Sequence, residues 1–394
     1  MTVVSKGLKA HDDARQFPDV ASVAMALAPS YPVHCVRPKI LKRSAERFIT
    51  LFPGTVLYAV KCNPHPLVLD ALYQGGLRHF DTASLPEIAQ IAETYERAHC
   101  YFMHPVKARA VIRSAYSVYG VRVFVVDHMN ELEKVIEACE GDDLTIVVRL
   151  DTPPVDGTFY HLAEKFGADV EEAAELIKAA DARGLKTGLS FHVGSQCGDP
   201  KAYGRALEIV GQVIQDSGVT PVCIDVGGGF PVTYPNLAAP ALEDFVDEVR
   251  AGIKALALPP TVEVLAEPGR ALVAAGCSLL VQVQLRKDRR LYINDGIYGS
   301  LTEVHQAKLE LPARLIRLQG TPSGETESYT LNGPTCDSLD VLPVRFTLPA
   351  DVREGDWIEI DSIGAYSYAL ATHFNGFHPH TFVEVFDEPP EGPR

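Results

Sequence analysis

Residues 77–104, LRHFDTASLPEIAQIAETYERAHCYFMH, contain the pattern that decides the fold. A short apolar run, Leu77–Phe80, precedes an amphipathic stretch with helical spacing, Leu85–Ala98, and a second short run, Cys100–Met103, comes next. Similar runs recur along the chain and together number eight: Thr55–Val60, Leu77–Phe80, Cys100–Met103, Val121–Val126, Leu144–Val148, Thr187–Phe191, Val222–Ile224 and Val262–Ala266. Eight strand–helix units predict a (β/α)8 TIM-like barrel, and a doubly wound open sheet is the alternative.

The polar residue after each run indicates where a site would form. In order, these residues are Lys61, Asp81, His104, Asp127, Arg149, His192, Asp225 and Glu267. Each would lie at the carboxyl end of a parallel strand, the face where barrel enzymes assemble their sites. Strands also end in polar residues because they reach solvent, but eight such residues, including lysine, arginine and histidine, favour an active site.

After Arg270 the helical periodicity gives way to short β-like runs separated by glycine, proline, asparagine and aspartate. These runs are Ser278–Leu285, Arg290–Ile293, Ala313–Leu318, Glu327–Leu331 and Trp357–Ile360. They predict an all-β second domain, to which Pro32–Val36 can add a strand. We therefore expect an N-terminal segment contributing to the β domain (1–36), a barrel domain (37–275) and a C-terminal β domain (276–394).

Composition and charge limit the partners and the compartment. The 394 residues include 51 acidic and 36 basic ones, a formal charge of −15, which argues against nucleic-acid or anionic-membrane partners and suits a cationic small molecule. The start lacks an apolar signal region, and the longest nearly apolar stretch, Ala271–Val283, is too short for a bilayer. Eight cysteines without CxxC spacing indicate neither a zinc site nor disulfides, so we expect reduced thiols, no bound metal and a cytoplasmic protein.

Two segments carry residues suited to covalent chemistry and phosphate binding. Lys61 ends the apolar run in LYAVKCN, and desolvation in a barrel mouth would lower its pKa and leave an amine able to form a Schiff base. A lysine whose ammonium simply reaches solvent is the common alternative. The three glycines of Asp225–Phe230 (DVGGGF) expose backbone N–H groups that can bind a phosphate, although a flexible turn has the same composition.

Three further segments extend this set. In AEPGR, Glu267 can pair with a protonated ring nitrogen and Arg270 with a phosphate, and His192 of FHVGSQ can stack on an aromatic ring. In GPTCDSLD, the Cys336 thiol can act as a general acid and the Asp337 carboxylate can bind a cationic group. Each has a structural alternative, but together they form the set that pyridoxal 5′-phosphate (PLP) requires.

The motifs YAVKCN, HVGSQ, DVGGGFP, AEPGR, GPTCDSLD and FNGF, in this order and spacing, resemble those of the fold-type III PLP-dependent decarboxylases. The resemblance runs from about residue 32 to about residue 380 and is strongest to the ornithine decarboxylase branch. It implies the alanine racemase-like architecture of fold type III, a (β/α)8 barrel followed by an all-β C-terminal domain. Lys61-Cys-Asn and Cys336-Asp337 favour the basic-amino-acid branch over the diaminopimelate decarboxylases.

The resemblance also implies a role for individual residues. Lys61 would hold PLP covalently, Glu267 would keep its pyridinium protonated and His192 would stack on it. The remaining cofactor-binding residues implied are Asp81, Arg149, Ser195, Gly228, Gly229, Gly269, Arg270 and Tyr366. Cys336 would protonate the carbanion, and the substrate-binding residues would be Asp337, Tyr298 and Phe374. A homodimer with shared active sites is implied, in which Lys165 pairs with Asp340 across the interface.

One position departs from the family pattern. Eukaryotic ornithine decarboxylases carry a second acidic residue in the segment after DGxYGS, and the equivalent spacing here falls on Ala307. Asp337 alone, or Asp337 with a water or Glu303, would then bind the distal ammonium. We therefore expect decarboxylation of L-ornithine to putrescine for polyamine biosynthesis, with L-lysine, giving cadaverine, as a second substrate. The alternatives are another substrate, such as diaminopimelate or carboxynorspermidine, and an inactive homologue acting as a binding protein, which would be expected to lose Lys61, Cys336 or Asp337.

Overall fold

The computed structural model describes residues 15–141, 143–154, 159 and 165–388. Eight parallel strands close into a barrel in the order β10-β3-β4-β5-β6-β7-β8-β9. They are β3 (Thr55–Ala59), β4 (His79–Thr82), β5 (His99–Phe102), β6 (Val123–Val126), β7 (Thr145–Arg149), β8 (Lys186–Ser190), β9 (Cys223–Asp225) and β10 (Glu263–Ala266). The predicted barrel is confirmed, and the open-sheet alternative is wrong.

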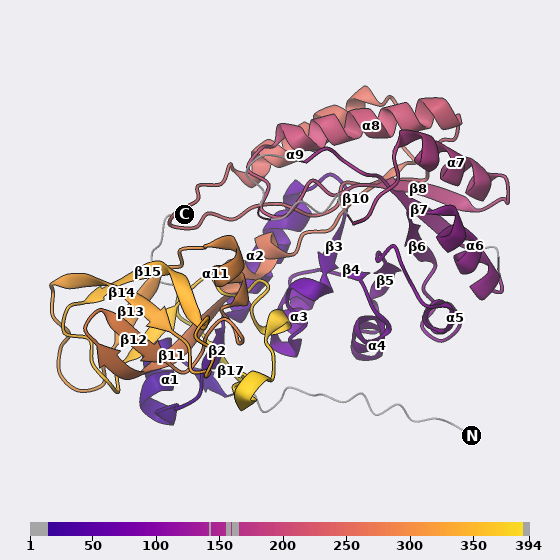
Figure 1. Ribbon diagram of the computed structural model, residues 1–394. Coiled ribbons are helices and arrows are strands. Elements are labelled where there is room, and N and C mark those ends of the chain that lie inside the picture. The colour runs from indigo at the N-terminus through magenta and orange to yellow at the C-terminus, as the bar shows by residue number, and fades with distance from the viewer. Residues whose placement is uncertain (1–14, 142, 155–158, 160–164, 389–394) are drawn as a thin grey trace, which may run out of the picture.

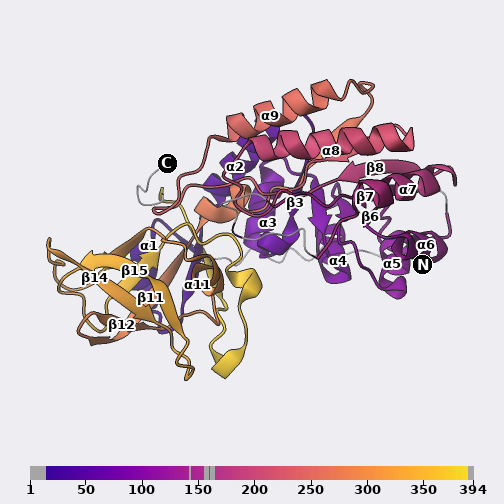
Figure 2. The ribbon, with the colours of Figure 1, turned by 45° about the horizontal axis from the view of Figure 1, so that its top comes forward.

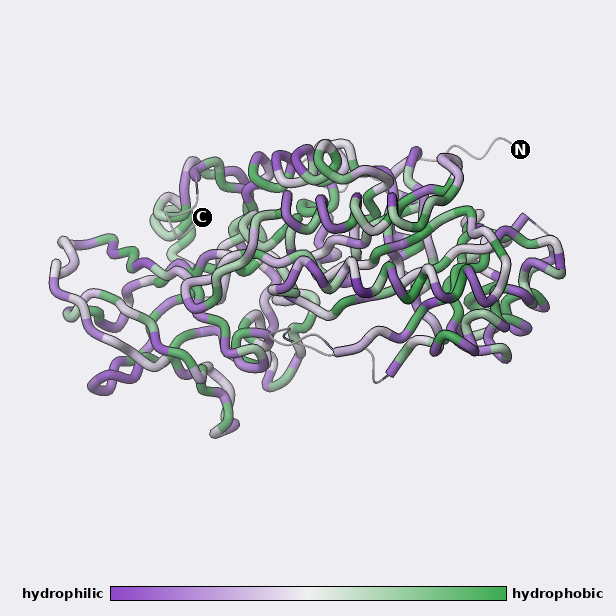
Figure 3. Tube along the Cα trace, turned by 90° about the horizontal axis from the view of Figure 1, so that it is seen from above, coloured by the Kyte–Doolittle hydropathy of each residue, from purple (hydrophilic) through white to green (hydrophobic). Residues whose placement is uncertain are grey.

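Helices cover the outside of the barrel (Figures 1 and 2). They are α2 (Pro38–Leu51), α3 (Pro66–Gln74), α4 (Leu85–Thr94), α5 (Arg109–Ser117), α6 (Met129–Ala138), α7 (Val170–Asp181), α8 (Lys201–Ser217) and α9 (Leu242–Ala255). The short α10 (Arg270–Val273) follows β10 and packs against α2. Local sequence sets their starts: Asp169 and Glu172 form a capping box at α7. Hydrophilic and hydrophobic residues alternate along the helices (Figure 3), as expected when one face packs on a core.

The barrel strands are buried on both faces. Leu57, Val125 and Val147 belong to a small cluster contributed by several strands, whereas Phe80 and Phe124 pack in the large cluster shared with the helices. Because neither face meets water, these strands appear in the sequence as continuous apolar runs rather than as alternating ones.

The second part of the molecule is a nine-stranded sheet beside the barrel (Figure 1). Its main path contains β1 (Gln16–Phe17), β17 (Thr381–Val385), β2 (Val33–Val36), β11 (Cys277–Lys287), β12 (Arg290–Ile293), β14 (Thr326–Asn332) and β15 (Val341–Pro349). Off this path, β16 (Trp357–Ile360) pairs with both β11 and β13 (Ala313–Ile316). Strand β2 pairs with β11 and β17, so the N-terminal segment enters this sheet. The boundaries at residues 36 and 275 stay a proposal.

Strand β15 has no counterpart among the predicted runs. Its residues alternate, with Leu342, Val344, Phe346 and Leu348 buried. Pro343 and Pro349 make this strand hard to predict from the sequence, because proline normally marks the end of a strand. Proline is tolerated here because β15 ends the main path of the sheet, next to β14. Strand β17 and helices α1 (Val20–Leu27) and α11 (Thr302–Ala307) were also missed.

A buried arginine ties the two parts together. Arg37 lies just before α2, is 1% exposed, and pairs with Glu359 of β16 at 2.7 Å and with Asp387 at 3.0 Å. Arg314 reaches the other oxygen of Glu359 at 2.6 Å. Because buried charges are stable only when paired, this network fixes the β sheet against the first helix of the barrel.

Candidate active site

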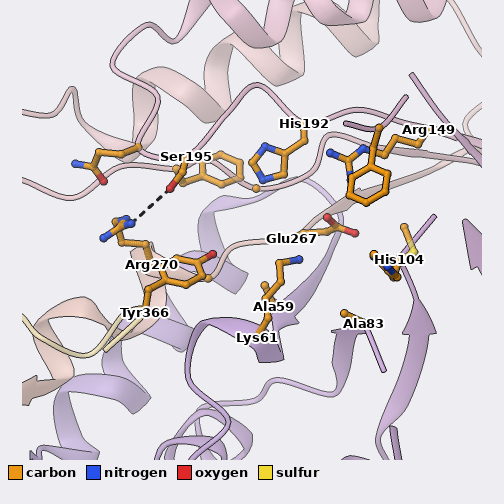
Figure 4. A pocket seen from close by; sticks show the side chains of 17 residues that line it. Ala59, Lys61, Ala83, His104, Arg149, His192, Ser195, Glu267, Arg270 and Tyr366 are labelled. Carbon is orange, nitrogen blue, oxygen red and sulfur yellow. Dashed lines mark hydrogen bonds between the residues drawn. The ribbon is translucent and has the colours of Figure 1, made fainter. Parts of the chain in front are cut away.

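One pocket lies at the carboxyl ends of the barrel strands and gathers residues from several of them (Figure 4). The predicted site residues that line it are Lys61, Arg149, His192, Ser195, Gly228, Gly229, Glu267, Gly269, Arg270 and Tyr366. His104, which follows an apolar run and was expected at this face of the barrel, lines it as well, together with residues that the sequence did not indicate, namely Ala59, Ala83, Met103, Phe166, Gln196 and Phe230. The apolar residues among them carry no chemical signature in the local sequence, because they contribute shape rather than reactive groups.

Lys61 extends into the pocket and is paired. Its Nζ donates to Asp81 Oδ2 at 2.6 Å, and 44% of the lysine side chain is exposed. Burial alone would lower the pKa of Lys61, but the carboxylates of Asp81 and Glu267 outweigh it and raise this pKa. The expectation of a lowered lysine pKa is therefore wrong, because desolvation was weighed without the neighbouring carboxylate. Asp81 Oδ1 is buried and has no hydrogen-bond partner within the described residues.

Glu267 follows β10 and faces the same pocket. Burial and the neighbouring carboxylates of Asp225 and Asp81 raise its pKa well above the usual value for glutamate. A cationic ring nitrogen beside it would reverse this shift, since an opposite charge favours the ionised carboxylate. The position therefore suits a cationic heterocycle.

His192 presents a neutral imidazole to the pocket. Its Nδ1 accepts a hydrogen bond from the backbone N–H of Gly194 at 3.0 Å. Burial, followed by the charges of Arg149 and Lys61, lowers the pKa of His192 to about 3. The ring is therefore uncharged at neutral pH and available for stacking against an aromatic ligand.

Gly228, Tyr366, Ser195 and Arg270 line a part of the pocket suited to an anion, which we call the anion cradle. A β-carbon on Gly228 would lie 2.6 Å from the carbonyl oxygen of Glu267, so only glycine fits there. Tyr366 adopts a left-handed backbone conformation with φ of 50°, and its N–H donates to the carbonyl of Cys62 at 2.9 Å. The Ser195 hydroxyl accepts a hydrogen bond from Arg270 Nη2 at 3.4 Å (Figure 4).

Arg270 is the cationic side chain at this cradle, and its guanidinium pairs with the carboxylate of Glu303. It is 4% exposed, and Tyr234 accepts a hydrogen bond from its Nη1 at 3.0 Å. Its Nε is buried and has no hydrogen-bond partner in the described parts of the chain. An unpaired buried donor beside close-packed glycines fits a phosphate group.

The family model described as "Pyridoxal-dependent decarboxylase, pyridoxal binding domain" matches residues 39–274, more than half of the chain. The chain belongs to this family of pyridoxal-dependent decarboxylases. It is 33% identical over 347 residues to the lysine/ornithine decarboxylase of Selenomonas ruminantium, covering 85% of this chain and 84% of that protein.

Two solved structures support the same assignment. The arginine decarboxylase of Paramecium bursaria Chlorella virus matches with a TM-score of 0.82 at 28% identity, covering 93% of this chain and 99% of that one. The lysine/ornithine decarboxylase of Vibrio vulnificus, complexed with putrescine, matches with a TM-score of 0.79 at 31% identity, covering 94% and 99%. This chain is thus a PLP-dependent amino-acid decarboxylase, similar to ornithine decarboxylases, and its pocket fits the cofactor.

Four predicted residues of this decarboxylase lie outside the pocket of their own chain. Cys336 is exposed on the loop after β14, and its backbone N–H donates to Asn375 Oδ1 at 3.1 Å. The neighbouring Asp337 accepts hydrogen bonds from the Leu339 N–H at 2.9 Å and from the Tyr298 hydroxyl. Hydrogen bonds from these two residues lower the pKa of Asp337. The ring of Phe374 lies 4.7 Å from that of Tyr298.

The predicted interface pair of this decarboxylase is likewise apart within one chain. Lys165 is exposed, with its Nζ 5.0 Å from the centre of the Phe166 ring. Asp340 is 3% exposed and accepts hydrogen bonds from the Ile297 N–H at 2.9 Å and from the Thr335 hydroxyl at 2.7 Å.

Glu303 occupies a different place from the one expected. It lies in the first turn of α11, is 4% exposed, and its carboxylate pairs with Arg270 at the anion cradle. A role in binding the distal ammonium is therefore wrong, because both its oxygens are engaged by a buried guanidinium. Ala307 ends the same helix and contributes a partly buried methyl group.

Neither a metal centre nor a membrane-spanning helix is found within the described residues. Within the described residues, no group of three or more histidine, cysteine, aspartate or glutamate side chains is arranged to hold a metal ion. Among the same residues, no helix is both long and apolar enough to cross a membrane.

Proposed function

We propose that this decarboxylase converts L-ornithine to putrescine and CO2, feeding polyamine biosynthesis, and also accepts L-lysine, which gives cadaverine. The observation that carries the proposal is the ionised Asp337 carboxylate next to the Cys336 thiol. A carboxylate complements the distal ammonium of a basic amino acid. It would repel the second carboxylate of diaminopimelate, and the relatives named above are lysine/ornithine and arginine decarboxylases.

Different residues of the pocket would hold different parts of the cofactor. Lys61 would bind it covalently, with Asp81 beside the amine to take or return a proton. Glu267 would face the ring nitrogen, His192 and Arg149 the ring, and the phosphate would lie at Ser195, Gly228, Gly229, Gly269, Arg270 and Tyr366. PLP, when bound, takes up the electron pair left when the bond from Cα to the carboxylate breaks. The unpaired Nε of Arg270 and the close approach at Gly228 support this placement.

The proposed substrate residues would reach a pocket only in a second subunit. Cys336, Asp337, Tyr298 and Phe374 lie on the β domain and do not line the pocket of their own chain, as far as that pocket is described. A homodimer that places this loop in the partner subunit's pocket would complete both sites. Cys336 would then protonate Cα, Asp337 would bind the distal ammonium, and Lys165 would approach Asp340 across the interface.

Product analysis tests the proposal. The holoenzyme is incubated separately with L-ornithine, L-lysine, L-arginine and meso-diaminopimelate, and amines and CO2 are quantified. We expect putrescine as the main product and cadaverine at a lower rate. A larger yield from diaminopimelate or arginine would replace the proposed substrate. No CO2 from any of these four substrates, with PLP bound, would overturn the proposal and leave carboxynorspermidine decarboxylation or an inactive homologue.

A further inference from the structure

The anion cradle contains a carboxylate, although a carboxylate opposes the binding of a phosphate. Glu303 Oε2 accepts a hydrogen bond from Arg270 Nη1 at 2.8 Å, and Oε1 accepts one from Nη2. The side chains are 6% and 4% exposed, so solvent screens the pair little. The position of Glu303 beside the proposed phosphate site therefore needs an explanation.

The hydrogen bonds of Arg270 suggest one. Nη1 donates to Glu303 and Tyr234, and Nη2 donates to Glu303 and, at 3.4 Å, to Ser195. Nε has no partner in the described parts of the chain. Glu303 therefore holds both Nη atoms, while Nε and the long Nη2 contact leave donor capacity for another acceptor.

We propose that Glu303 is a positioning residue that acts through Arg270 to set the affinity for the PLP phosphate. A buried guanidinium without a counterion would be unstable and would leave this position. The bidentate contact with Glu303 fixes the plane of the guanidinium beside Ser195 and neutralises its charge. The phosphate is then bound by oriented N–H and hydroxyl groups around a fixed arginine rather than by a free cation.

Titrations of the apoenzyme with PLP and with pyridoxal, which lacks the phosphate, test this inference. In Glu303→Ala and Glu303→Gln we expect the Kd for PLP to rise by roughly tenfold to a hundredfold, the range for a charge-assisted hydrogen bond. The Kd for pyridoxal should stay unchanged, because only the phosphate contact is affected. Glu303→Gln preserves the side-chain shape and carries the test if Glu303→Ala does not fold. Glu310→Gln, at an exposed glutamate after α11, is the matched control.

The double variant shows whether Glu303 acts through Arg270. Arg270→Ala combined with Glu303→Ala should bind PLP no more weakly than Arg270→Ala alone. The inference would be overturned if the Glu303 variants lost affinity for PLP and for pyridoxal equally, because this would indicate a general structural role for Glu303. Unchanged or tighter PLP binding in Glu303→Gln, or additive losses in the double variant, would overturn it too.

The inference rests on the proposed placement of the phosphate, and one variant separates the two. If Arg270→Ala binds PLP as well as the wild type, the proposed phosphate site itself fails. If Arg270→Ala weakens PLP binding and the Glu303 variants do not, only the role of Glu303 fails.

Discussion

Replacing Asp337 with asparagine removes one negative charge from the proposed substrate site. The Tyr298 hydroxyl, which donates to Oδ2 of Asp337, would instead accept a hydrogen bond from the new amide N–H. The Oδ1 contact with the Leu339 N–H, at 2.9 Å, can be kept by the amide oxygen, so the loop should retain its conformation. The lost interaction is a charge-assisted one with the distal ammonium. We therefore expect kcat/KM for L-ornithine to fall roughly tenfold to a hundredfold in Asp337→Asn, and further in Asp337→Ala.

Steady-state decarboxylation rates with L-ornithine, L-lysine and L-norleucine provide the assay. The values of kcat/KM for ornithine and lysine should fall together, because both carry the ammonium, whereas any slow turnover of uncharged norleucine should not fall. The Kd for PLP should be unchanged, since Asp337 does not line the described pocket of its own chain. Asp288→Asn, at an exposed aspartate between β11 and β12, is the matched control. An Asp337→Asn enzyme with wild-type efficiency for ornithine would refute the reasoning and point to another group.

The remaining predictions concern the attachment of the cofactor, the shared site, the pKa of Lys61 and the stability of the fold. Lys61→Ala should abolish the absorption band of lysine-bound cofactor and the activity without changing the circular dichroism spectrum; an active variant with that band would contradict the assignment. Mixing inactive Lys61→Ala and Cys336→Ala subunits should restore up to about a quarter of wild-type activity by random exchange, and none despite demonstrated exchange would argue against shared sites. Asp81→Asn removes a carboxylate that raises the pKa of Lys61, so the pH midpoint for attachment of PLP, followed by absorbance, should move to lower pH; an upward shift would contradict this. Arg37→Ala should lower the free energy of unfolding in urea by about 3 kcal/mol, the lower end of the range for breaking a buried pair, because Arg314 still contacts Glu359; a change below about 1 kcal/mol would show that the network adds little.

The barrel, and the residues expected at the carboxyl ends of its strands, could be predicted from the amino-acid sequence. Local patterns were sufficient, because strands buried on both faces are continuous apolar runs and helices show their own periodicity. Parallel strands bring their carboxyl ends to one edge, so the residues after the runs, Lys61 and Glu267 among them, had to lie near one another. Strand β15 could not be predicted in this way, because Pro343 interrupts its alternating pattern. A proline is tolerated in this strand because β15 lies at the end of the main path of the sheet.

The pairing of charged side chains could not be predicted from the sequence, because it depends on the folded chain. Asp81 contacts Lys61 from a neighbouring strand and raises the pKa that desolvation alone would lower. Glu303 and Arg270 are 33 residues apart, and nothing in the local sequence of α11 distinguishes a glutamate facing a buried arginine from one facing substrate or solvent. Secondary structure follows from short-range patterns, whereas ion pairs, pKa shifts and the partners of a buried charge depend on distances between segments that the chain brings together only when it folds.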